Sequence, residues 1–433
     1  MNEAVAGFIG LFLVLALFFT GIELGFAMAL VGFLGFGYVV SVKAALNLLA
    51  KDLFDVFSSY GFTVIPLFIF MGQIAFNAGI AKRLYDTAYK FFGHVPGGLA
   101  MATVGAATAF KAICGSSPAT AATFASVAVP EMDRYGYHKK LSTGIVATVG
   151  TLGILMPPSV TLIVFGIITE QSIGKLFLAG LIPGLIIALF FILIIYGWCK
   201  INPALGPKGQ KSSWKERVAS LPEVVWVGII FLLVIGGLMK GFFTPTEAGS
   251  VGTFAVLLLS LAKRDLNFRG FVKSVGESLR TACMVIMLIA GSTILGHFLA
   301  VTKIPMNAAD WILQLNFDRN LTMILIALIY LLGGSFIDDL AFMILATPIF
   351  YPVIIQLGFD PIWFGMIIGI TVMIGVVIPP VAINVFVVKN ITRVPFGVIY
   401  KGVYPFLISL VVCAFLLFLF PQIALFLPSY FMK

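Results

Sequence analysis

The sequence predicts an all-α integral membrane protein made of two related halves. Hydrophobic residues make up 61% of the 433 positions, charged residues make up only 10%, and the mean hydropathy is +1.11. Soluble domains average about 45–50% apolar and about 25% charged residues, and this composition cannot supply the polar surface that they need. Apolar runs of about 20 residues, the length that crosses the hydrocarbon core as a helix, recur along the chain. A stretch of the first half also recurs in the second half.

About ten segments are predicted to cross the membrane, and they are 4–20, 24–42, 60–79, 141–169, 176–199, 222–240, 246–262, 281–301, 361–388 and 402–420. The first has no basic stretch before it and no clear cleavage site, so we expect a retained span and not a signal peptide. Residues 97–133 and 320–350 are too interrupted by Gly, Pro and small polar residues for one clean span. Each is therefore predicted to form a re-entrant hairpin.

The basic residues orient these segments. With both hairpins re-entrant, most of the 27 Lys and Arg residues fall on one side, in loops such as 200–217 and 263–280. Cytoplasmic loops collect Lys and Arg, so this side is predicted to be cytoplasmic and both termini to face outward. The net charge of +9 is explained by these short loops, and no nucleic-acid partner is expected.

The two halves share a sequence pattern at a constant spacing. Residues 129–158 align with 351–380 without a gap, so that Gly153 matches Gly375 and Pro157-Pro158 matches Pro379-Pro380. Each half then holds five spans and one hairpin, and because five is odd the second half must be inverted. The predicted units are 1–200, with hairpin 97–133 and broken helix 141–169; a cytoplasmic connector, 201–221; and 222–433, with hairpin 320–350 and broken helix 361–388. Inverted repeats with broken helices are typical of secondary transporters, which bind their solute where the repeats meet.

The first hairpin turns at Cys114-Gly-Ser-Ser-Pro-Ala-Thr120. Gly115 and Pro118 break the helix, and freed backbone groups are costly in hydrocarbon unless something satisfies them. Backbone carbonyls and the hydroxyls of Ser116, Ser117 and Thr120 would suit a hard monovalent cation, and amides at a half-helix N-terminus would suit a carboxylate. Alternatively, Gly-Ser-Ser only allows helices to pack closely.

The second hairpin turns at Gly333-Gly-Ser-Phe-Ile-Asp-Asp339. Acidic residues at membrane depth are functional candidates by default. Asp338 is nearer the break and is the preferred ligand, whereas Asp339 is expected to cap the helix or to face water.

Two Pro-Pro pairs break long spans, because proline cannot donate the helical hydrogen bond and clashes with the preceding turn. Thr151, Gly153, Ser159 and Thr161 surround the first break, and Thr371, Gly375 and Asn384 surround the second. Unwound backbone within the membrane should line a cavity or be buried in protein. The alternative is a kink that only serves packing.

Other chemistry finds no support in the sequence. The four Cys and three His residues have no metal-ligand spacing, and we expect neither a cofactor nor a metal other than sodium. No nucleotide-binding motif is present, and no enzymatic activity is expected.

Several motifs together resemble one family of transporters. They are Cys114-Gly-Ser-Ser-Pro-Ala-Thr, Val129-Pro-Glu-Met-Asp-Arg-Tyr-Gly-Tyr, Leu152-Gly-Ile-Leu-Met-Pro-Pro-Ser, Phe243-Thr-Pro-Thr-Glu-Ala and Gly358-Phe-Asp-Pro-Ile-Trp-Phe-Gly. The chain resembles, essentially end to end, the large membrane subunit of tripartite ATP-independent periplasmic (TRAP) transporters. One departure is Ile378, where the family often has Thr before the second Pro-Pro, so no side-chain hydroxyl can contribute there.

The resemblance implies sodium-driven import of a small acidic organic solute, such as a sialic acid, a C4-dicarboxylate or a related carboxylate, across the bacterial inner membrane. It implies a periplasmic binding protein and a small four-helix membrane subunit on a separate chain as partners, besides the lipid bilayer. It also implies an elevator mechanism, in which hairpins and broken helices slide past a scaffold drawn mainly from spans 4–42 and 222–262.

The residues and the resemblance together give two predicted sets. Sodium ligands are predicted among Gly115, Ser116, Ser117, Thr151, Gly153, Gly334, Ser335, Asp338, Thr371 and Gly375. Substrate contacts are predicted among Ser117, Thr120, Pro158, Ser159, Pro380 and Asn384. Two other functions compete: a stand-alone divalent-anion/sodium symporter that needs no binding protein, and a membrane scaffold or redox subunit.

Overall fold

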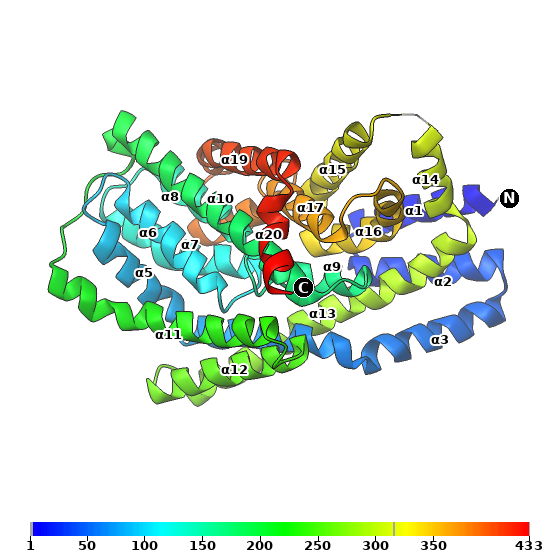
Figure 1. Cartoon of the computed structure of the whole chain (residues 1–433), viewed down its shortest axis with the longest axis horizontal. Coiled ribbons are helices and arrows are strands. Elements are labelled where there is room, and N and C mark those ends of the chain that lie inside the picture. The colour runs from blue at the N-terminus through cyan, green and yellow to red at the C-terminus, as the bar shows by residue number, and fades with distance from the viewer. Residues whose placement is uncertain (1–2, 315–316, 433) are drawn as a thin grey trace.

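The structure is a computed structural model, which describes residues 3–314 and 317–432, and all regular elements of this part of the chain are helices (Figure 1). The first half contains α1 (Glu3–Phe19), α2 (Leu24–Val39), α3 (Val42–Ser58), α4 (Val64–Asn77), α5 (Ile80–Phe92), α6 (Gly98–Lys111), α7 (Ser117–Arg134), α8 (Lys139–Val149), α9 (Val160–Ile168) and α10 (Ile173–Ile201). The second half contains α11 (Trp214–Met239), α12 (Pro245–Ala262), α13 (Phe268–Val301), α14 (Ile304–Gln314), α15 (Arg319–Phe336), α16 (Asp339–Gln356), α17 (Pro361–Gly375), α18 (Ile383–Thr392), α19 (Phe396–Leu419) and α20 (Gln422–Phe431). The predicted all-α fold class is confirmed.

The helices suit a lipid environment. Among the described residues, eight helical segments are long and apolar enough to cross a membrane, and five shorter apolar helices accompany them. Large apolar side chains such as Phe12, Leu232, Phe254 and Phe415 are exposed on the outer helices. A water-soluble surface would not carry so many, so these faces contact lipid in a multi-pass membrane protein.

Four helices were not predicted from the apolar runs: α3, α5, α14 and α20. Helix α3 interrupts its apolar residues with charged ones, including Lys51 and Asp52, so a search for continuous apolar stretches passes over it. Its apolar residues nevertheless recur at helical spacing, which is the pattern of an amphipathic helix. Several predicted spans also begin earlier than expected: α11 starts at Trp214, α13 at Phe268 and α19 at Phe396, which lengthens each helix at its N-terminal end.

Small residues let two long helices pack backbone to backbone. Helix α2 lies along α13, and a methyl group added to Gly32 would lie only 2.7 Å from the backbone nitrogen of Leu295. Gly25 and Gly291 form a second close approach between the same helices. Helices α4 and α12 pair similarly, and Thr253 Oγ1 donates to the Leu67 carbonyl at 2.8 Å. Such contacts are the usual means by which helices associate in membranes.

Each half contains a hairpin followed by a broken helix. In the first half, α6 and α7 form the hairpin, and a 3₁₀ turn (Gly150–Ile154) with Pro157-Pro158 separates α8 from α9. In the second half, α15 and α16 form the hairpin, and Pro379-Pro380 separates α17 from α18. Both Pro-Pro bonds are cis. The Gly and Pro signals therefore mark the first tip and the two breaks. The second turn was expected over 333–339, but α15 continues through Gly333 and Gly334 to Phe336, and only Ile337 and Asp338 lie between the two helices.

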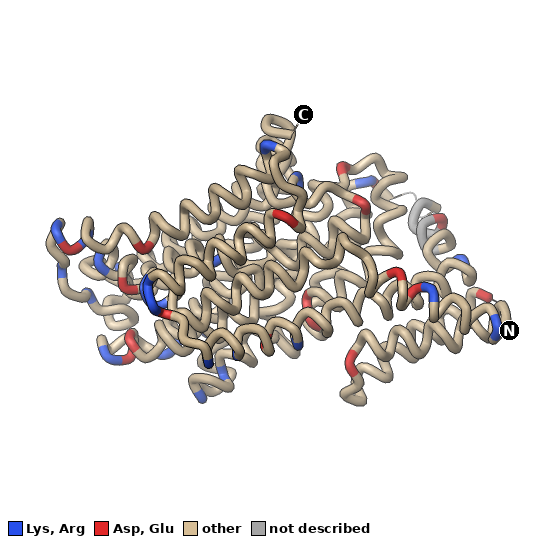
Figure 2. Tube along the Cα trace, turned by 90° about the horizontal axis from the view of Figure 1, so that it is seen from below, with Lys and Arg blue, Asp and Glu red and all other residues tan. Residues whose placement is uncertain are grey.

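Charge is unevenly distributed over the molecule. Figure 2 shows Lys and Arg concentrated toward the end opposite the N-terminus. In Figure 1 that end carries α5, α6 and the connector between α10 and α11, whereas α1, α2 and α14 lie at the N-terminal end. This distribution is consistent with the charge asymmetry from which the sequence was oriented.

Candidate functional site

The tip of the first hairpin is a short irregular segment between α6 and α7. Ser116 caps α7, because its hydroxyl oxygen accepts a hydrogen bond from the Ala119 amide at 3.4 Å. Pro118 stands in the first turn of α7, where its missing N–H costs nothing. The Ser116 carbonyl accepts from Thr120 Oγ1 at 2.9 Å and from Lys111 Nζ at 2.7 Å. The break predicted from Gly115 and Pro118 thus ends in a tip whose backbone oxygens are directed toward polar partners.

The tip of the second hairpin is shorter. Helix α15 ends at Phe336 and α16 begins at Asp339, which leaves Ile337 and Asp338 between them. The carbonyl of Ser335 accepts from the Val381 amide at 3.1 Å, and a methyl group on Gly375 would lie 2.7 Å from the Gly334 carbonyl carbon. The second tip is therefore held against the Pro-Pro break of its own half.

Each hairpin also bonds to the broken helix of the opposite half. Ser117, the first residue of α7, exchanges hydrogen bonds with Asn384 of α18, at 3.0 Å from Asn384 Nδ2 and 3.3 Å to Asn384 Oδ1. Asp339, the first residue of α16, accepts a hydrogen bond from Thr161 of α9 at 3.4 Å. The hairpins and broken helices of the two halves are thereby interlocked by buried polar contacts.

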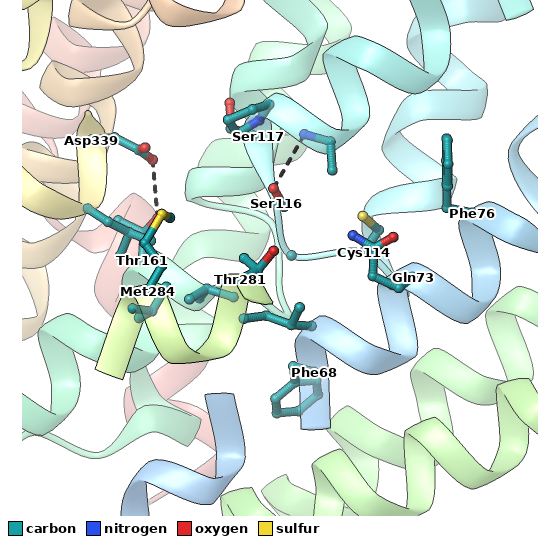
Figure 3. Close-up of a pocket in the computed structure, with 18 of the residues that line it drawn as sticks. Phe68, Gln73, Phe76, Cys114, Ser116, Ser117, Thr161, Thr281, Met284 and Asp339 are labelled. Carbon is teal, nitrogen blue, oxygen red and sulfur yellow. Dashed lines mark hydrogen bonds between the residues drawn. The ribbon is translucent and has the colours of Figure 1, made fainter. Parts of the chain in front are cut away.

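A cavity of about 300 Å³ lies where these elements meet α4 and α13 (Figure 3). That volume is at the small end of ligand pockets, which are about 300–1,000 Å³. Helices α4 and α13 form one wall, with Phe68, Gln73, Phe76, Thr281 and Met284 among its residues. The other wall consists of Cys114–Ala119 and Thr123 of the first hairpin, Val160 and Thr161 of α9, and Asp338–Leu340 of the second hairpin.

Three helix N-termini converge on this cavity. The first residues of α7, α9 and α16 all line it: Ser117, Val160 and Asp339. The N-terminus of a helix carries unpaired amides and a partial positive charge, so such a convergence favours an anion. Ser116 and Ser159 cap two of these helices and fix the direction of their first turns.

The acidic residues of the second tip make the cavity locally less favourable for an anion. Asp339 is only 5% exposed and Asp338 is half-buried, and neither forms an ion pair within the part of the chain that the structure describes. Adjacent buried carboxylates need a cation or protons to balance them. Asp339 was expected to cap its helix or to face water, but it lies buried against Thr161 and on the cavity wall.

The predicted residues fall into two groups. Gly115, Ser116, Ser117 and Asp338 line the cavity. The others do not line it, and each hydroxyl among them bonds to a nearby carbonyl: Thr120 to Ser116, Thr151 to Thr148, Ser159 to Ile154, Ser335 to Leu332 and Thr371 to Ile367.

The two Pro-Pro breaks differ in environment. Pro158 is buried, and a methyl group added to Gly115 would lie 2.6 Å from the Pro158 carbonyl oxygen. Pro380 is exposed, and Asn384 behind it is buried against Ser117. Gly153 and Gly375 each lie against a hairpin, Gly153 against Lys111 and Gly375 against Gly334. These residues of the two breaks therefore contact the hairpins or their surroundings without lining the cavity.

Sequence reasoning passed over Lys111, Gln73 and Thr281. Lys111 is completely buried although it is charged. An ionisable residue inside an apolar stretch is a signal that was available, because such residues are rare and costly in membranes. Gln73 and Thr281 gave no comparable signal, since their place on the cavity wall depends on how α4 and α13 pack.

The sequence comparisons agree on one family, and one solved structure shares the fold. A family model described as "Tripartite ATP-independent periplasmic transporter, DctM component" matches residues 11–423. The C4-dicarboxylate TRAP transporter large permease protein DctM of Pseudomonas aeruginosa is 34% identical over 88% of this chain and 89% of its own length. The sialic acid TRAP transporter large permease protein SiaM of Vibrio cholerae is 31% identical over 96% and 97%, respectively. A crystal structure of the Alcanivorax borkumensis YdaH transporter shares the fold, with a TM-score of 0.55 and 13% identity over 88% of this chain and 89% of that one.

Proposed function

The chain belongs to the DctM component family of tripartite ATP-independent periplasmic transporters, and on that basis we propose that it imports a small organic carboxylate, together with sodium ions, through the cavity between its hairpins. As a large permease subunit it is a transport protein of the bacterial inner membrane and not an enzyme. The solute, the coupling ion and the mechanism are the proposed parts.

The convergence of three helix N-termini on one cavity carries the proposal of an acidic solute. The first residues of α7, α9 and α16 line a shared space of about 300 Å³. A solute carboxylate would be favoured by the partial positive charge of these N-termini. Gln73 and Thr281 on the scaffold wall offer polar contacts to the remainder of the solute. Relatives named for C4-dicarboxylate and for sialic acid transport set the class of solute that we propose.

Sodium is the proposed coupling ion because the hairpin tips offer oxygen ligands and uncompensated negative charge. Asp338 and Asp339 follow Ser335 in the chain at the second tip, and Gly375 lies against Gly334 of the same hairpin. Oxygen ligands of this kind suit a hard cation. A sodium ion at the second tip would neutralise the carboxylates and make the cavity more favourable for an anionic solute, which couples the binding of the two.

The division of the cavity wall supports an elevator mechanism with two inverted repeats. The hairpins and broken helices interlock through Ser117–Asn384 and Thr161–Asp339, whereas α4 and α13 supply the opposite wall. We propose that the interlocked elements move as one body past α4 and α13, carrying solute and sodium. In this arrangement the solute is enclosed between the moving body and the scaffold.

The partners follow from the family, whose transporters combine a large permease with a small membrane subunit and a periplasmic binding protein. We propose that the small subunit of this transporter is a separate four-helix chain. Exposed apolar side chains on α1, α11 and α12 leave room for such a partner in the membrane, as well as for lipid.

Reconstitution tests the proposal. Uptake of radiolabelled succinate and of sialic acid is measured in proteoliposomes that contain this chain and its small partner. The binding protein and an inward sodium gradient are supplied together and then omitted one at a time. Uptake that requires both is expected. Uptake without the binding protein would favour a stand-alone symporter. Uptake that does not depend on the sodium gradient would refute sodium coupling.

A further inference from the structure

Lys111 is the last residue of α6 and is completely buried at the base of the first hairpin tip. Its Nζ donates a hydrogen bond to the Ser116 carbonyl at 2.7 Å. Its ammonium group also lies against Gly153 in the 3₁₀ turn of the broken helix, where a methyl group at position 153 would overlap Nζ. The side chain therefore bridges the hairpin tip and the interrupted part of the broken helix.

A buried ammonium group needs substantial compensation. Within the described residues, Lys111 forms no ion pair within 4 Å, so carbonyl oxygen is its direct partner. Lys111 stands at the C-terminal end of α6, where the helix dipole adds partial negative charge. Asp339 also contributes a favourable electrostatic interaction from across the site. These are the features of a site for a hard monovalent cation, and here a lysine side chain fills it.

The environment of Lys111 coincides with residues that the sequence assigned to a first-half sodium ion. Ser116 and Gly153 contact the ammonium group, and Thr151 belongs to the same 3₁₀ turn as Gly153. A methyl group at position 153 would displace the end of the Lys111 side chain, which occupies the space beside this glycine. An ion bound between the first tip and this turn would have to share that space with Nζ.

The second half differs at the equivalent position. The spacing that aligns Gly115-Ser116 with Gly334-Ser335 aligns Lys111 with Tyr330. Tyr330 is also completely buried, but it is uncharged, and its hydroxyl lies 3.1 Å from Thr347 Oγ1. The second half instead carries the two carboxylates, Asp338 and Asp339. One half thus supplies its own positive charge, and the other supplies negative charge that needs a cation.

We propose that the Lys111 ammonium group is a resident cation that takes the place of a sodium ion in the first half of the transporter. The inference rests on the proposed sodium coupling and specifies it. Sodium then binds at the second tip, and the first hairpin is held closed on its broken helix by a covalently attached charge. Removing that charge opens an additional sodium site.

Three variants separate charge from volume. Lys111→Ala empties the site, Lys111→Met fills it without charge, and Tyr330→Phe is the matched control at the equivalent buried position. Solute uptake and ²²Na⁺ uptake are measured in proteoliposomes that contain each variant with the small partner and the binding protein. Lys111→Ala should raise the number of sodium ions taken up per solute molecule by about one. The Hill coefficient of solute uptake against sodium concentration should rise accordingly. Lys111→Met should lose uptake at every sodium concentration, and Tyr330→Phe should keep the wild-type ratio.

A second measurement does not depend on transport. The thermal stability of each purified complex is followed while NaCl replaces choline chloride at constant ionic strength. Sodium should stabilise Lys111→Ala more than wild type, and it should stabilise Lys111→Met no more than wild type, since the second tip is unchanged in both. If wild-type uptake does not depend on sodium, the proposed coupling is wrong. The titration still tests whether the Lys111 ammonium group occupies a site that sodium can fill.

Two results would overturn the inference. One is an unchanged sodium ratio in Lys111→Ala together with a sodium titration like that of wild type. The other is a yield of folded Lys111→Ala that is equally low with and without sodium while Lys111→Met folds normally. A yield that recovers when sodium is present during purification would support the additional site.

Discussion

The contact between Ser117 and Asn384 joins the first hairpin to the broken helix of the second half, and its strength can be predicted. Two hydrogen bonds link these buried side chains, at 3.0 Å and 3.3 Å. Interhelical hydrogen bonds in membrane proteins contribute about 0.6 kcal/mol on average and up to about 1.7 kcal/mol. A double-mutant cycle of Ser117→Ala and Asn384→Ala should therefore give a coupling energy of about 1–2 kcal/mol.

The single variants should differ in their costs. Asn384→Ala also removes a hydrogen bond to the Ala147 carbonyl at 3.2 Å and leaves a cavity at a fully buried position. It should therefore destabilise the protein more than Ser117→Ala does, since an unsatisfied buried group costs about 1–3 kcal/mol. Free energies of unfolding are measured by reversible SDS titration of the chain in complex with its small partner.

A control cycle uses Thr371→Val with Asn384→Ala. Thr371 Oγ1 bonds to the Ile367 carbonyl of its own helix, so this cycle should show no coupling beyond about 0.5 kcal/mol. A Ser117–Asn384 coupling no larger than that of the control would refute the claim that the hairpin and the opposite broken helix are bonded as described.

Three further predictions follow from other sites. Gly115→Ala places a methyl group 2.6 Å from the Pro158 carbonyl oxygen and should cost about 1–3 kcal/mol of unfolding free energy. Gly197→Ala has open space around it and should be tolerated. SDS titration of both variants checks this. Asp339→Asn should raise the sodium concentration for half-maximal solute uptake about tenfold or more, because hydrogen bonds to a charged group contribute about 1.5–3 kcal/mol. Unchanged sodium dependence would contradict the role of this carboxylate. Burial raises the pKa of Asp52 in α3, and nearby His297 only partly offsets the effect. The folded state then holds a proton that the unfolded state releases above about pH 4. The thermal stability of wild type should therefore fall relative to that of Asp52→Asn as pH rises through the raised pKa.

The interruptions of the helices could be predicted from the sequence because they have local causes. Gly115 with Pro118 and the two Pro-Pro pairs remove backbone hydrogen bonds wherever they occur, so the hairpin tip and the breaks follow from residue chemistry. The amphipathic helix α3 could also have been predicted from its spacing, but the search for continuous apolar runs favoured spans over surface helices.

The contacts across the site could not be predicted in the same way. Sequence order places Ser117 beside Pro118 and Asp339 beside Asp338, but it does not indicate that one side chain reaches Asn384 and the other reaches Thr161. These partners are separated by well over a hundred positions and meet only because each hairpin packs on the opposite broken helix. The preference for Asp338 over Asp339 relied on distance from the break, whereas the burial of each side chain depends on that packing.

The interlocking has a mechanical consequence for the proposed movement. A hairpin could not slide alone, because Ser117 and Asp339 would each leave a buried polar partner unsatisfied at about 1–3 kcal/mol. The buried Lys111 adds a third connection, between the first tip and the turn at Gly153. By contrast, the wall formed by α4 and α13 meets the cavity largely through apolar side chains such as Phe68 and Met284, which can exchange neighbours at little cost. If the solute is carried by movement, the polar contacts therefore require both hairpins and both broken helices to move together, and the boundary of the moving body lies along α4 and α13.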